Sequence, residues 1–273
     1  MKTIYYYQTF CDLNNIIKNS KFVDVIILSS MHFGRFNDTP YIHLNNNYPS
    51  SPLYDKTWMD LQKLYYDGVQ IMCMVGGAGG AYNNLFSDYD TYYPMFKEFL
   101  KGHNIITGVD LDIEESVTIN DVKKFINDLI KDFGEDFTIT MAPVASSLTN
   151  DSSSGFSGIN YKELYNSEIG KYISWFNVQA YECFNLQTYD DIIKNNYPSE
   201  MIIFGMISGD FFNNFDKALD EIKKIKNKYP NFLGCDIWEL VNSPPDVNDP
   251  SQWAYKLKNL NYSHRKFLGI YGP

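Results

Sequence analysis

Eight short apolar runs recur along the chain, and a stretch with helical periodicity follows each of them. The strand-like runs are 3–8, 22–30, 69–75, 105–114, 137–143, 173–181, 201–208 and 232–239. The helix-like stretches are 12–18, 55–67, 88–101, 118–133, 160–170, 187–196, 213–229 and 248–260. Strands that alternate with helices form parallel α/β sheets, and eight such units in 273 residues are typical of a closed (β/α)8 barrel, or TIM barrel. A doubly wound open sheet is the alternative that the same pattern allows.

Composition narrows the class of partner. The net charge of −10 disfavours nucleic acid and anionic membranes as partners and fits an uncharged substrate. No linker or shift in composition divides the chain, so we expect one domain over residues 1–273, and we expect a monomer. No apolar run approaches the length of a membrane-spanning helix. Because Met1-Lys2-Thr3 leads straight into the first strand, we expect no signal peptide and a cytoplasmic protein, unless the sequence begins at a mature end.

Cysteine and histidine spacing gives no metal-binding pattern. The four cysteines are far apart and form no C-x-x-C pair: Cys11, Cys73, Cys183 and Cys235. We expect them to be free thiols. The four histidines also lack the spacing of metal ligands: His32, His43, His103 and His264. The sequence therefore implies neither a metal nor an organic cofactor.

The fourth strand-like run carries three carboxylates, Asp110, Asp112 and Glu114, that alternate with aliphatic residues. A strand sends alternate side chains to one face, about 6.5–7 Å apart. At an effective dielectric near 20, neighbouring ionised groups at that spacing repel by about 2 kcal/mol. This repulsion can hold a proton on one member of the row, as a general acid at neutral pH requires. A solvated acidic face is the alternative interpretation. Barrel enzymes place their chemistry at the C-terminal ends of strands, where Glu114 lies.

Five motifs stand at the ends of predicted strands, and one of them is Thr107-Gly108-Val109-Asp110-Leu111-Asp112-Ile113-Glu114. This run resembles the D-G-x-D-x-D-x-E of the fourth strand in glycoside hydrolase family 18 at seven of the eight positions, with Thr107 in place of the first Asp. The other motifs are Met74-Val75-Gly76-Gly77 (family S-x-G-G, with Met74 for Ser), Met141-Ala142-Pro143, Gln179-Ala180-Tyr181 (family Q-x-Y) and Trp238. We expect the changes at Thr107 and Met74 to alter pKa tuning more than to abolish chemistry.

Within the family, the chain most resembles a fungal-type group of small endo-β-N-acetylglucosaminidases, a group whose pattern is close to that of small plant-type chitinases. The segments that carry this likeness are Met74-Val75-Gly76-Gly77-Ala78, Ala142-Pro143-Val144-Ala145-Ser146, Trp238-Glu239 with Asn242-Ser243, and Ile42-His43-Leu44-Asn45 followed by Pro49 and Trp58. The resemblance implies cleavage, with retention, of the β-1,4 bond between N-acetylglucosamine units. The expected substrate is the chitobiose core of N-glycans, and chitin or its oligosaccharides are the alternative.

The resemblance also implies roles for individual residues through substrate-assisted catalysis. Glu114 is the expected acid and base, Asp112 orients the substrate's acetamide, Asp110 shares a proton or charge with Asp112, and Tyr181 donates its hydroxyl to the acetamido oxygen. Eight further residues are expected to bind substrate: Gln179, Asn177, Trp238, Tyr6, Gln8, Gly76, Gly77 and Met141. Barrel filling is the alternative for Tyr6 and Gln8, core packing for Trp238, and a tight turn for the two glycines.

Two other functions remain open from the residues alone. The first is a lectin of the same fold that binds glycans without cutting them. The second is a barrel glycosidase with an ordinary nucleophile from another strand end, such as Glu182 or Glu239. Residues 209–231 hold only one predicted helix, which leaves no room for the small inserted α+β domain of larger chitinases. We therefore expect an open, shallow cleft that cuts internal bonds, with long loops at 31–54 and 144–159 setting the substrate.

Overall fold

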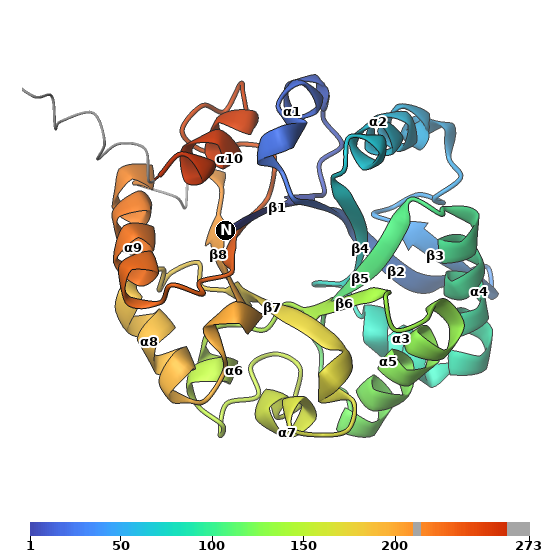
Figure 1. Cartoon of the computed structure of the whole chain (residues 1–273). Helices are drawn as coiled ribbons and strands as arrows, with labels where there is room; N and C mark the ends of the chain where they lie inside the picture. The colour runs from blue at the N-terminus through green and yellow to red at the C-terminus, as the bar shows by residue number, and fades with distance from the viewer. Residues whose placement is uncertain (210–213, 261–273) are drawn as a thin grey trace, which may run out of the picture.

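The computed structural model describes residues 1–209 and 214–260 of this chain. Eight parallel strands close into a barrel, because β1 pairs with both β2 and β9 (Figure 1). The barrel strands are β1 (Lys2–Tyr7), β2 (Val25–Phe36), β4 (Gln70–Gly76), β5 (Ile106–Asp112), β6 (Thr138–Met141), β7 (Ile173–Gln179), β8 (Ile202–Ile207) and β9 (Gly234–Trp238). The predicted (β/α)8 barrel is confirmed, and the doubly wound alternative is wrong.

Helices surround the barrel in a ring (Figure 1). They are α1 (Asn14–Lys18), α2 (Asp55–Tyr66), α3 (Ala81–Ser87), α4 (Tyr89–Gly102), α5 (Ile119–Phe133), α6 (Ser146–Thr149), α7 (Tyr161–Tyr165), α8 (Leu186–Lys194), α9 (Phe215–Lys228) and α10 (Ser251–Lys258). Single 3-10 turns lie at Ser20–Phe22, Pro52–Tyr54, Gly170–Tyr172 and Ser199–Met201. Among the described residues, no helix has both the length and the apolar character needed to cross a membrane.

Two cores follow from the alternation of side chains along the strands. The larger core packs the outer faces of the strands against the helices. The smaller core fills the barrel with Ile4, Tyr6, Val25, Ile27, Met72, Met74, Trp175 and Ile203. Helix α5 illustrates the outer layer: Thr118 caps its first turn by accepting a hydrogen bond from the Asp121 amide at 3.2 Å. Its buried stripe, including Phe125 and Leu129, faces the sheet.

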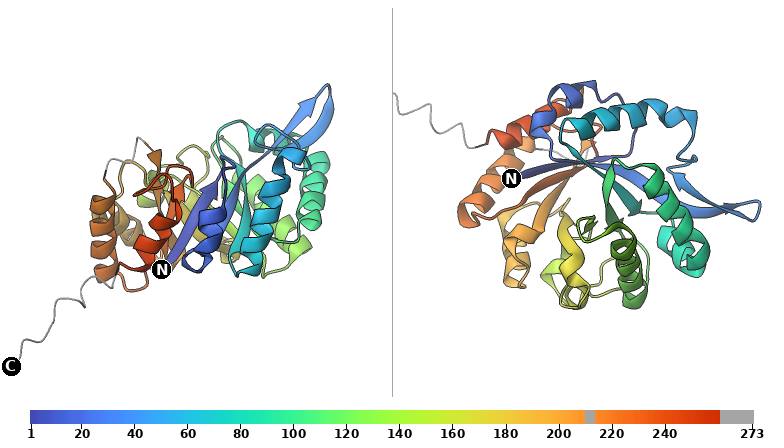
Figure 2. Two further views of the ribbon diagram at one scale, coloured as in Figure 1. Left: turned by 90° about the horizontal axis from the view of Figure 1, so that it is seen from above. Right: turned by 45° about the vertical axis from the view of Figure 1, so that its right-hand side comes forward.

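The expected loop at 31–54 is wrong, because it contains a β-hairpin. Strand β2 continues to Phe36, and β3 (Thr39–Leu44) returns antiparallel to it. Asn37 and Asp38 make the two-residue turn with φ of 47° and 62°, as a type I′ turn requires. The hairpin projects beyond the ring of helices (Figure 2). It gives the C-terminal mouth of the barrel a tall wall on one side.

Other boundaries shift by less. The expected loop at 144–159 contains α6, and the expected helix at 160–170 is reduced to α7 and a 3-10 turn. The predicted start of the helix at 213 lies outside the described residues, as does His264. The described residues between β8 and β9 hold α9 and no strand, in agreement with the predicted absence of an inserted α+β domain. All four cysteines are free thiols, as predicted.

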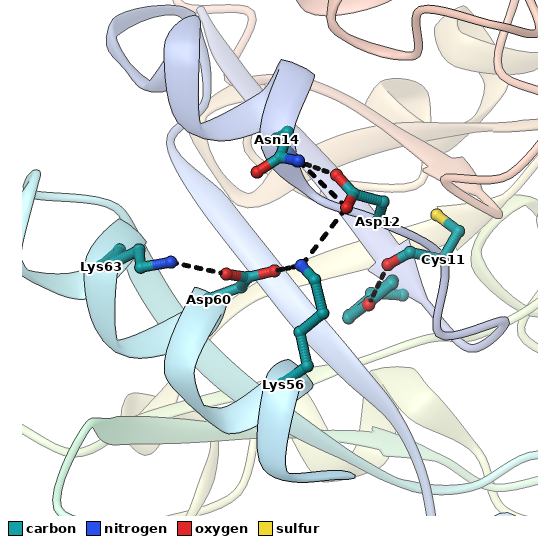
Figure 3. Close-up of polar contacts among 7 residues, drawn as sticks. Cys11, Asp12, Asn14, Lys56, Asp60 and Lys63 are labelled. Carbon is teal, nitrogen blue, oxygen red and sulfur yellow. Dashed lines mark hydrogen bonds and ion pairs between the residues drawn. The ribbon is translucent and has the colours of Figure 1, made fainter. Parts of the chain in front are cut away.

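Polar contacts hold the loop after β1 against α2 (Figure 3). Asp12 accepts hydrogen bonds from Asn14 and lies 3.3 Å from the Lys56 ammonium, which also pairs with Asp60. Lys63 reaches the other oxygen of Asp60 at 2.9 Å. The ammonium groups of both lysines are exposed, whereas the Asp60 side chain is buried. The combined effect of these contacts is to fix a loop that contributes residues 8–10 to the cleft described next.

Candidate active site

A cleft of about 900 Å³ opens at the C-terminal ends of the strands. The loops after β1, β4, β5, β7 and β9, together with the hairpin, supply its walls. Asp112, Glu114, Gln179, Tyr181 and Trp238 all line it. The structure thus brings together the ends of three strands, β5, β7 and β9, that lie far apart in the sequence.

Asp110 lies beneath this cleft and is fully buried. One carboxylate oxygen accepts a hydrogen bond from the Tyr6 hydroxyl at 2.7 Å. The other accepts from the Thr140 hydroxyl at 2.5 Å and from the Asn177 amide at 2.9 Å. Burial raises the pKa of Asp110, and these three donors oppose the rise because they stabilise the ionised form. Asn177 is held in turn by the Trp175 indole N–H at 2.9 Å.

Asp112 and Glu114 form the upper part of the row. Asp112 is 6% exposed and accepts a hydrogen bond from the Gln179 amide at 3.0 Å, an amide that also donates to the Ala142 carbonyl at 2.9 Å. Burial raises the pKa of Asp112 well above its usual range, and the neighbouring charges of Glu114 and Asp110 raise it further. Burial also raises the pKa of Glu114. The pair therefore holds a proton at pH values where isolated carboxyls would be ionised.

The glycine pair brings the end of β4 close to the end of β5. Gly76 and Gly77 have φ of 100° and 79°, and the Gly77 amide donates to the Asp112 carbonyl at 2.8 Å. A Cβ at Gly76 would clash with that same carbonyl oxygen and would lie 2.5 Å from the Tyr82 ring. Only glycine satisfies both the positive φ and the close approach. The pair lines the cleft and also fixes the backbone of Asp112.

Several expected substrate contacts lie elsewhere. Tyr6 and Asn177 are buried under the cleft and contact Asp110, so they position the carboxylate from below. Met141 is wrong as a substrate contact, because it is fully buried in the outer core. Strand alternation explains the error: in β6 the inward position belongs to Thr140, one residue earlier. Gln8 and Trp238 line the cleft as expected.

The two residues that depart from the family motifs lie at different depths. Met74 lines the cleft and supplies no strong hydrogen-bond donor there. Thr107 lies near the start of β5, where its hydroxyl accepts from the Gln70 amide at 3.3 Å. Gly108 beside it allows β5 and β6 to approach, because a Cβ there would lie 2.5 Å from the Thr138 carbonyl oxygen.

Asp236 is a further buried carboxyl in the barrel that the sequence interpretation missed. It lies in β9 opposite Ile4 and Gly205, is 2% exposed, and one of its oxygens has no hydrogen-bond partner among the described residues. A Cβ at Gly205 would lie 2.8 Å from the other oxygen. Burial raises the pKa of Asp236 well above its usual range, and the charge of Asp110 adds to the rise. The sequence feature that could have indicated it is a single Asp within the apolar strand Gly234–Trp238.

Tyr181 faces the same acidic group from the other wall. Burial raises the pKa of its hydroxyl well above the usual range, and the charges of Asp236 and Asp112 add to the rise. The hydroxyl therefore stays protonated and can donate a hydrogen bond into the cleft. Trp238 packs its ring 5.4 Å from that of Tyr6, with part of its surface left open to the cleft.

Neither alternative nucleophile lines the cleft. Glu239 accepts hydrogen bonds from the Gln8 amide at 3.1 Å and from the amide and hydroxyl of Thr9 at 2.7 and 2.6 Å, so it fastens the loop after β1. Glu182 is exposed and lines an adjoining hollow that shares Gln179 and Tyr181 with the cleft, but it is not among the residues that line the cleft itself. Among the described residues that line the cleft, the carboxylates are Asp112 and Glu114.

Comparison with known proteins agrees with this geometry. No family model matches the sequence, and no curated protein does. The structure is similar to a fungal endo-β-N-acetylglucosaminidase from glycosyl hydrolase family 18, with a TM-score of 0.84, 26% identity, and coverage of 95% of this chain and 98% of that one. It is similar to the chitinase ChiC from Aspergillus fumigatus with a TM-score of 0.83, 28% identity, and coverage of 94% and 98%. A GH18 chitinase from Pseudoalteromonas aurantia shares the fold, with a TM-score of 0.69 and 19% identity over 95% of this chain and all of that one.

The first two similarities span nearly the whole length of both chains, so the match covers the barrel and its loops together. The carboxylate row, the glycine pair, the glutamine–tyrosine pair and the tryptophan meet at one mouth of the barrel. These similarities and this arrangement support assignment of the chain to glycoside hydrolase family 18, as a glycosidase.

Proposed function

We propose that this glycosidase cleaves the β-1,4 bond between two N-acetylglucosamine units with retention, using the substrate's own acetamido group as nucleophile. The observation that carries the proposal is the pair Asp112 and Glu114 in a cleft that offers no further carboxylate among its described lining residues. An ordinary retaining enzyme needs a nucleophilic carboxylate that faces the acid across the scissile bond, about 5–5.5 Å away. Asp112 precedes Glu114 by two residues in the same segment, so it lies beside the acid and not across the bond from it. Glu182 and Glu239 do not meet this need, since one lines another cavity and the other is bound to Gln8 and Thr9.

The proposed reaction assigns one task to each group. Glu114 gives its proton to the glycosidic oxygen as the bond to the anomeric carbon breaks. The acetamido oxygen forms a bond to that carbon and gives an oxazolinium ion. Asp112 accepts a hydrogen bond from the acetamide N–H and stabilises the positive charge, while Tyr181 donates to the acetamido oxygen. Water, deprotonated by Glu114, then opens the ring from the same face as the departed group, which restores the original configuration.

Two surrounding features support this assignment. The raised pKa of Glu114 keeps the acid protonated at a higher pH than a free Glu side chain. The partly exposed face of Trp238 lies beside these groups and offers an apolar platform for a pyranose ring. Asp110, with its three donors, acts from below as the group that sets the charge of Asp112.

For the natural substrate we propose the chitobiose core of N-glycans, acted on by one catalytic domain that spans residues 1–273. The similarity to the fungal endo-β-N-acetylglucosaminidase supports this choice, and so does the position of His43 and Asn45 in the cleft wall. Chitin and its oligosaccharides are the second candidate, which the similarity to ChiC favours. An open barrel mouth suits internal cleavage of either glycan.

Mass spectrometry of products tests the proposal. Wild-type protein and Glu114→Gln are incubated with a high-mannose glycopeptide and, separately, with chitopentaose. Peptide left with one N-acetylglucosamine by the wild type and not by the variant is the expected result. Shortened chitin oligomers with an intact glycopeptide would make chitin the substrate. Glu115→Gln is the matched control, because Glu115 accepts from the Tyr82 amide and does not line the cleft. Glycan binding without turnover by wild type would make the protein a lectin.

A further inference from the structure

A second hollow of about 500 Å³ adjoins the active-site cleft. Asn46 and Asn47 line both cavities, so the two are continuous across the loop after β3. Phe36, Tyr41 and Tyr48 form its aromatic side. None of the roles proposed above uses this hollow.

The hairpin explains why aromatic rings gather there. Its inner face carries Met31, Phe33, Ile42 and Leu44, which are buried in the outer core. Strand alternation sends the next residues of each strand to the opposite face: His32, Gly34 and Phe36 from β2, and Thr39, Tyr41 and His43 from β3. Gly34 pairs with Tyr41, and the absent side chain leaves the Tyr41 ring lying over the β2 backbone.

Ring contacts connect this hollow to the cleft. Tyr48 lies 5.4 Å from Tyr41, Tyr41 lies 5.0 Å from His43, and His43 stacks on His32 at 5.4 Å, as measured between ring centroids. Both histidines line the active-site cleft. Four rings, three from the hairpin and Tyr48 from the loop after β3, thus follow one another from the outer hollow to the mouth of the barrel.

The chemistry of the hollow selects an uncharged ligand with apolar and hydroxyl surfaces. Its lining consists of three aromatic residues, two asparagines, two serines and Pro52, and includes no charged side chain. Phe36 and Tyr48 are 65% and 54% exposed. Aromatic faces with amide and hydroxyl groups beside them bind sugar rings through their C–H faces and hydroxyls.

We propose that this hairpin hollow is an outer sugar-binding site, which holds the part of the same glycan chain that continues beyond the sugar at Trp238. The proposal rests on the proposed function, since it assumes that a glycan occupies the cleft. Continuity through Asn46 and Asn47 is the reason that we assign the hollow to the substrate and not to a separate partner. Substrate length then affects affinity: glycans that reach the hollow bind more tightly than those that end in the cleft.

Calorimetric titration with glycans of two lengths tests the site. Glu114→Gln is used as the starting protein, so that bound glycans are not cut. The ligands are a high-mannose glycopeptide and the same glycopeptide with its mannose arms removed, and then chitohexaose and chitotriose. Adding Phe36→Ala and Tyr48→Ala together is expected to weaken binding of the longer member of the productive pair by roughly tenfold or more. The shorter member is expected to bind as before, because it does not reach the two rings.

Matched variants separate the site from an effect on folding. Tyr48→Phe keeps the ring and is expected to retain the affinity for the long glycan. Tyr66→Ala removes a more exposed tyrosine, 75% exposed at the C-terminal end of α2 near the start of β4, and is expected to change neither affinity. Equal weakening for both lengths, or no weakening for either, would overturn the outer site. Failure of the Glu114→Gln protein to bind any of the four sugars would overturn the proposed function itself, and the outer site with it.

Discussion

Replacing Asp236 with Asn is expected to make the stability of the barrel less dependent on pH. Asp236 is 2% exposed, and burial raises its pKa well above the usual range. The folded state therefore keeps a proton that the unfolded chain loses above a pH of about 4. Between that pH and the folded-state pKa, this group lowers the free energy of unfolding by about 1.4 kcal/mol for each pH unit. Asn has the same shape but does not titrate, so the free energy of unfolding of the variant does not fall with pH through this group.

The sign of the effect is specific. The contribution of protonated Asp236 to the free energy of unfolding is fully present below a pH of about 4. It is lost as the pH rises toward the folded-state pKa of Asp236. The difference in free energy of unfolding, variant minus wild type, is thus expected to grow with pH over this interval. The slope of the difference carries the result, because a constant offset can arise from the hydrogen bonds of the new amide. Asp110, Asp112 and Glu114 titrate in both proteins and largely cancel.

Urea denaturation of both proteins at half-unit steps from pH 4.5 to 7.5, at fixed ionic strength, measures this difference. The infrared band of a buried protonated carboxyl, lost in Asp236→Asn, gives a second readout. Asp220→Asn is a control that is expected to give no slope between pH 4.5 and 7.5, because the hydrogen bond from Lys223 lowers the pKa of Asp220, which then titrates below this range. Parallel pH profiles for wild type and Asp236→Asn would refute the argument, since they would mean that Asp236 is ionised in the folded protein throughout.

Three further substitutions test the support of the site. Tyr6→Phe removes a hydrogen-bond donor from buried Asp110 and is expected to lower the free energy of unfolding by about 1–3 kcal/mol, as measured by urea denaturation. It is also expected to raise the pKa of Asp110, which would shift the pH profile of kcat/KM. An unchanged profile would contradict the coupling of Asp110 to Asp112. Gly76→Ala is expected to destabilise by more than about 2 kcal/mol, because it adds a clash to a positive φ, whereas Gly68→Ala has a φ of 91° with open space around it and isolates the backbone cost. Thr118→Ala is expected to lower stability by about 1 kcal/mol through loss of the α5 cap, with Thr118→Ser retaining it, as thermal unfolding would report.

The barrel could be predicted because each of its units is encoded locally. Apolar strands such as Ile202–Ile207 and a striped, capped helix such as Ile119–Phe133 are readable from neighbouring residues alone. Closure follows from the number of units and the chain length. The alternation of Asp110 and Asp112 also placed both on the inner face, where the structure has them. These features depend on strand and helix periods and not on long-range packing.

The hairpin was missed although its signal was present. Met31 and Phe33 alternate with polar residues, Ile42 and Leu44 do the same, and Asn37-Asp38 between them suits a two-residue turn. The prediction ended the strand at residue 30 and assigned residues 31–54 to a loop. A strand that leaves the barrel and pairs outside it is visible only as a second alternating segment, and this one supplies the aromatic wall of the site.

Asp236 and Met141 show the other limit of prediction. A lone Asp in an apolar strand gives no period of its own, and its meaning depends on Gly205 and on Asp110 across the barrel. Met141 belonged to a motif at a strand end, yet the direction of its side chain depends on strand register. Thr140, one residue earlier, takes the inward place and bonds to Asp110. Contacts across the barrel axis therefore lie beyond what any single strand encodes.

The hydrogen-bond donors around the four buried and half-buried acids determine which of these acids carries negative charge. The four acids are Asp110, Asp112, Glu114 and Asp236. Asp110 receives three hydrogen bonds, so negative charge is best stabilised there, whereas one oxygen of Asp236 receives none among the described residues. Charge on Asp110 raises the pKa of both Asp112 and Asp236, in addition to the effect of burial. The protonated form is thereby favoured at Asp236, which has no role in the proposed reaction, and at Asp112, which is coupled to Glu114 at the cleft. Because Met74 supplies no strong donor, this distribution of charge depends on the three donors to Asp110, which are Tyr6, Thr140 and Asn177. A barrel without these donors would keep its row of carboxyls but lose the differences in pKa among them.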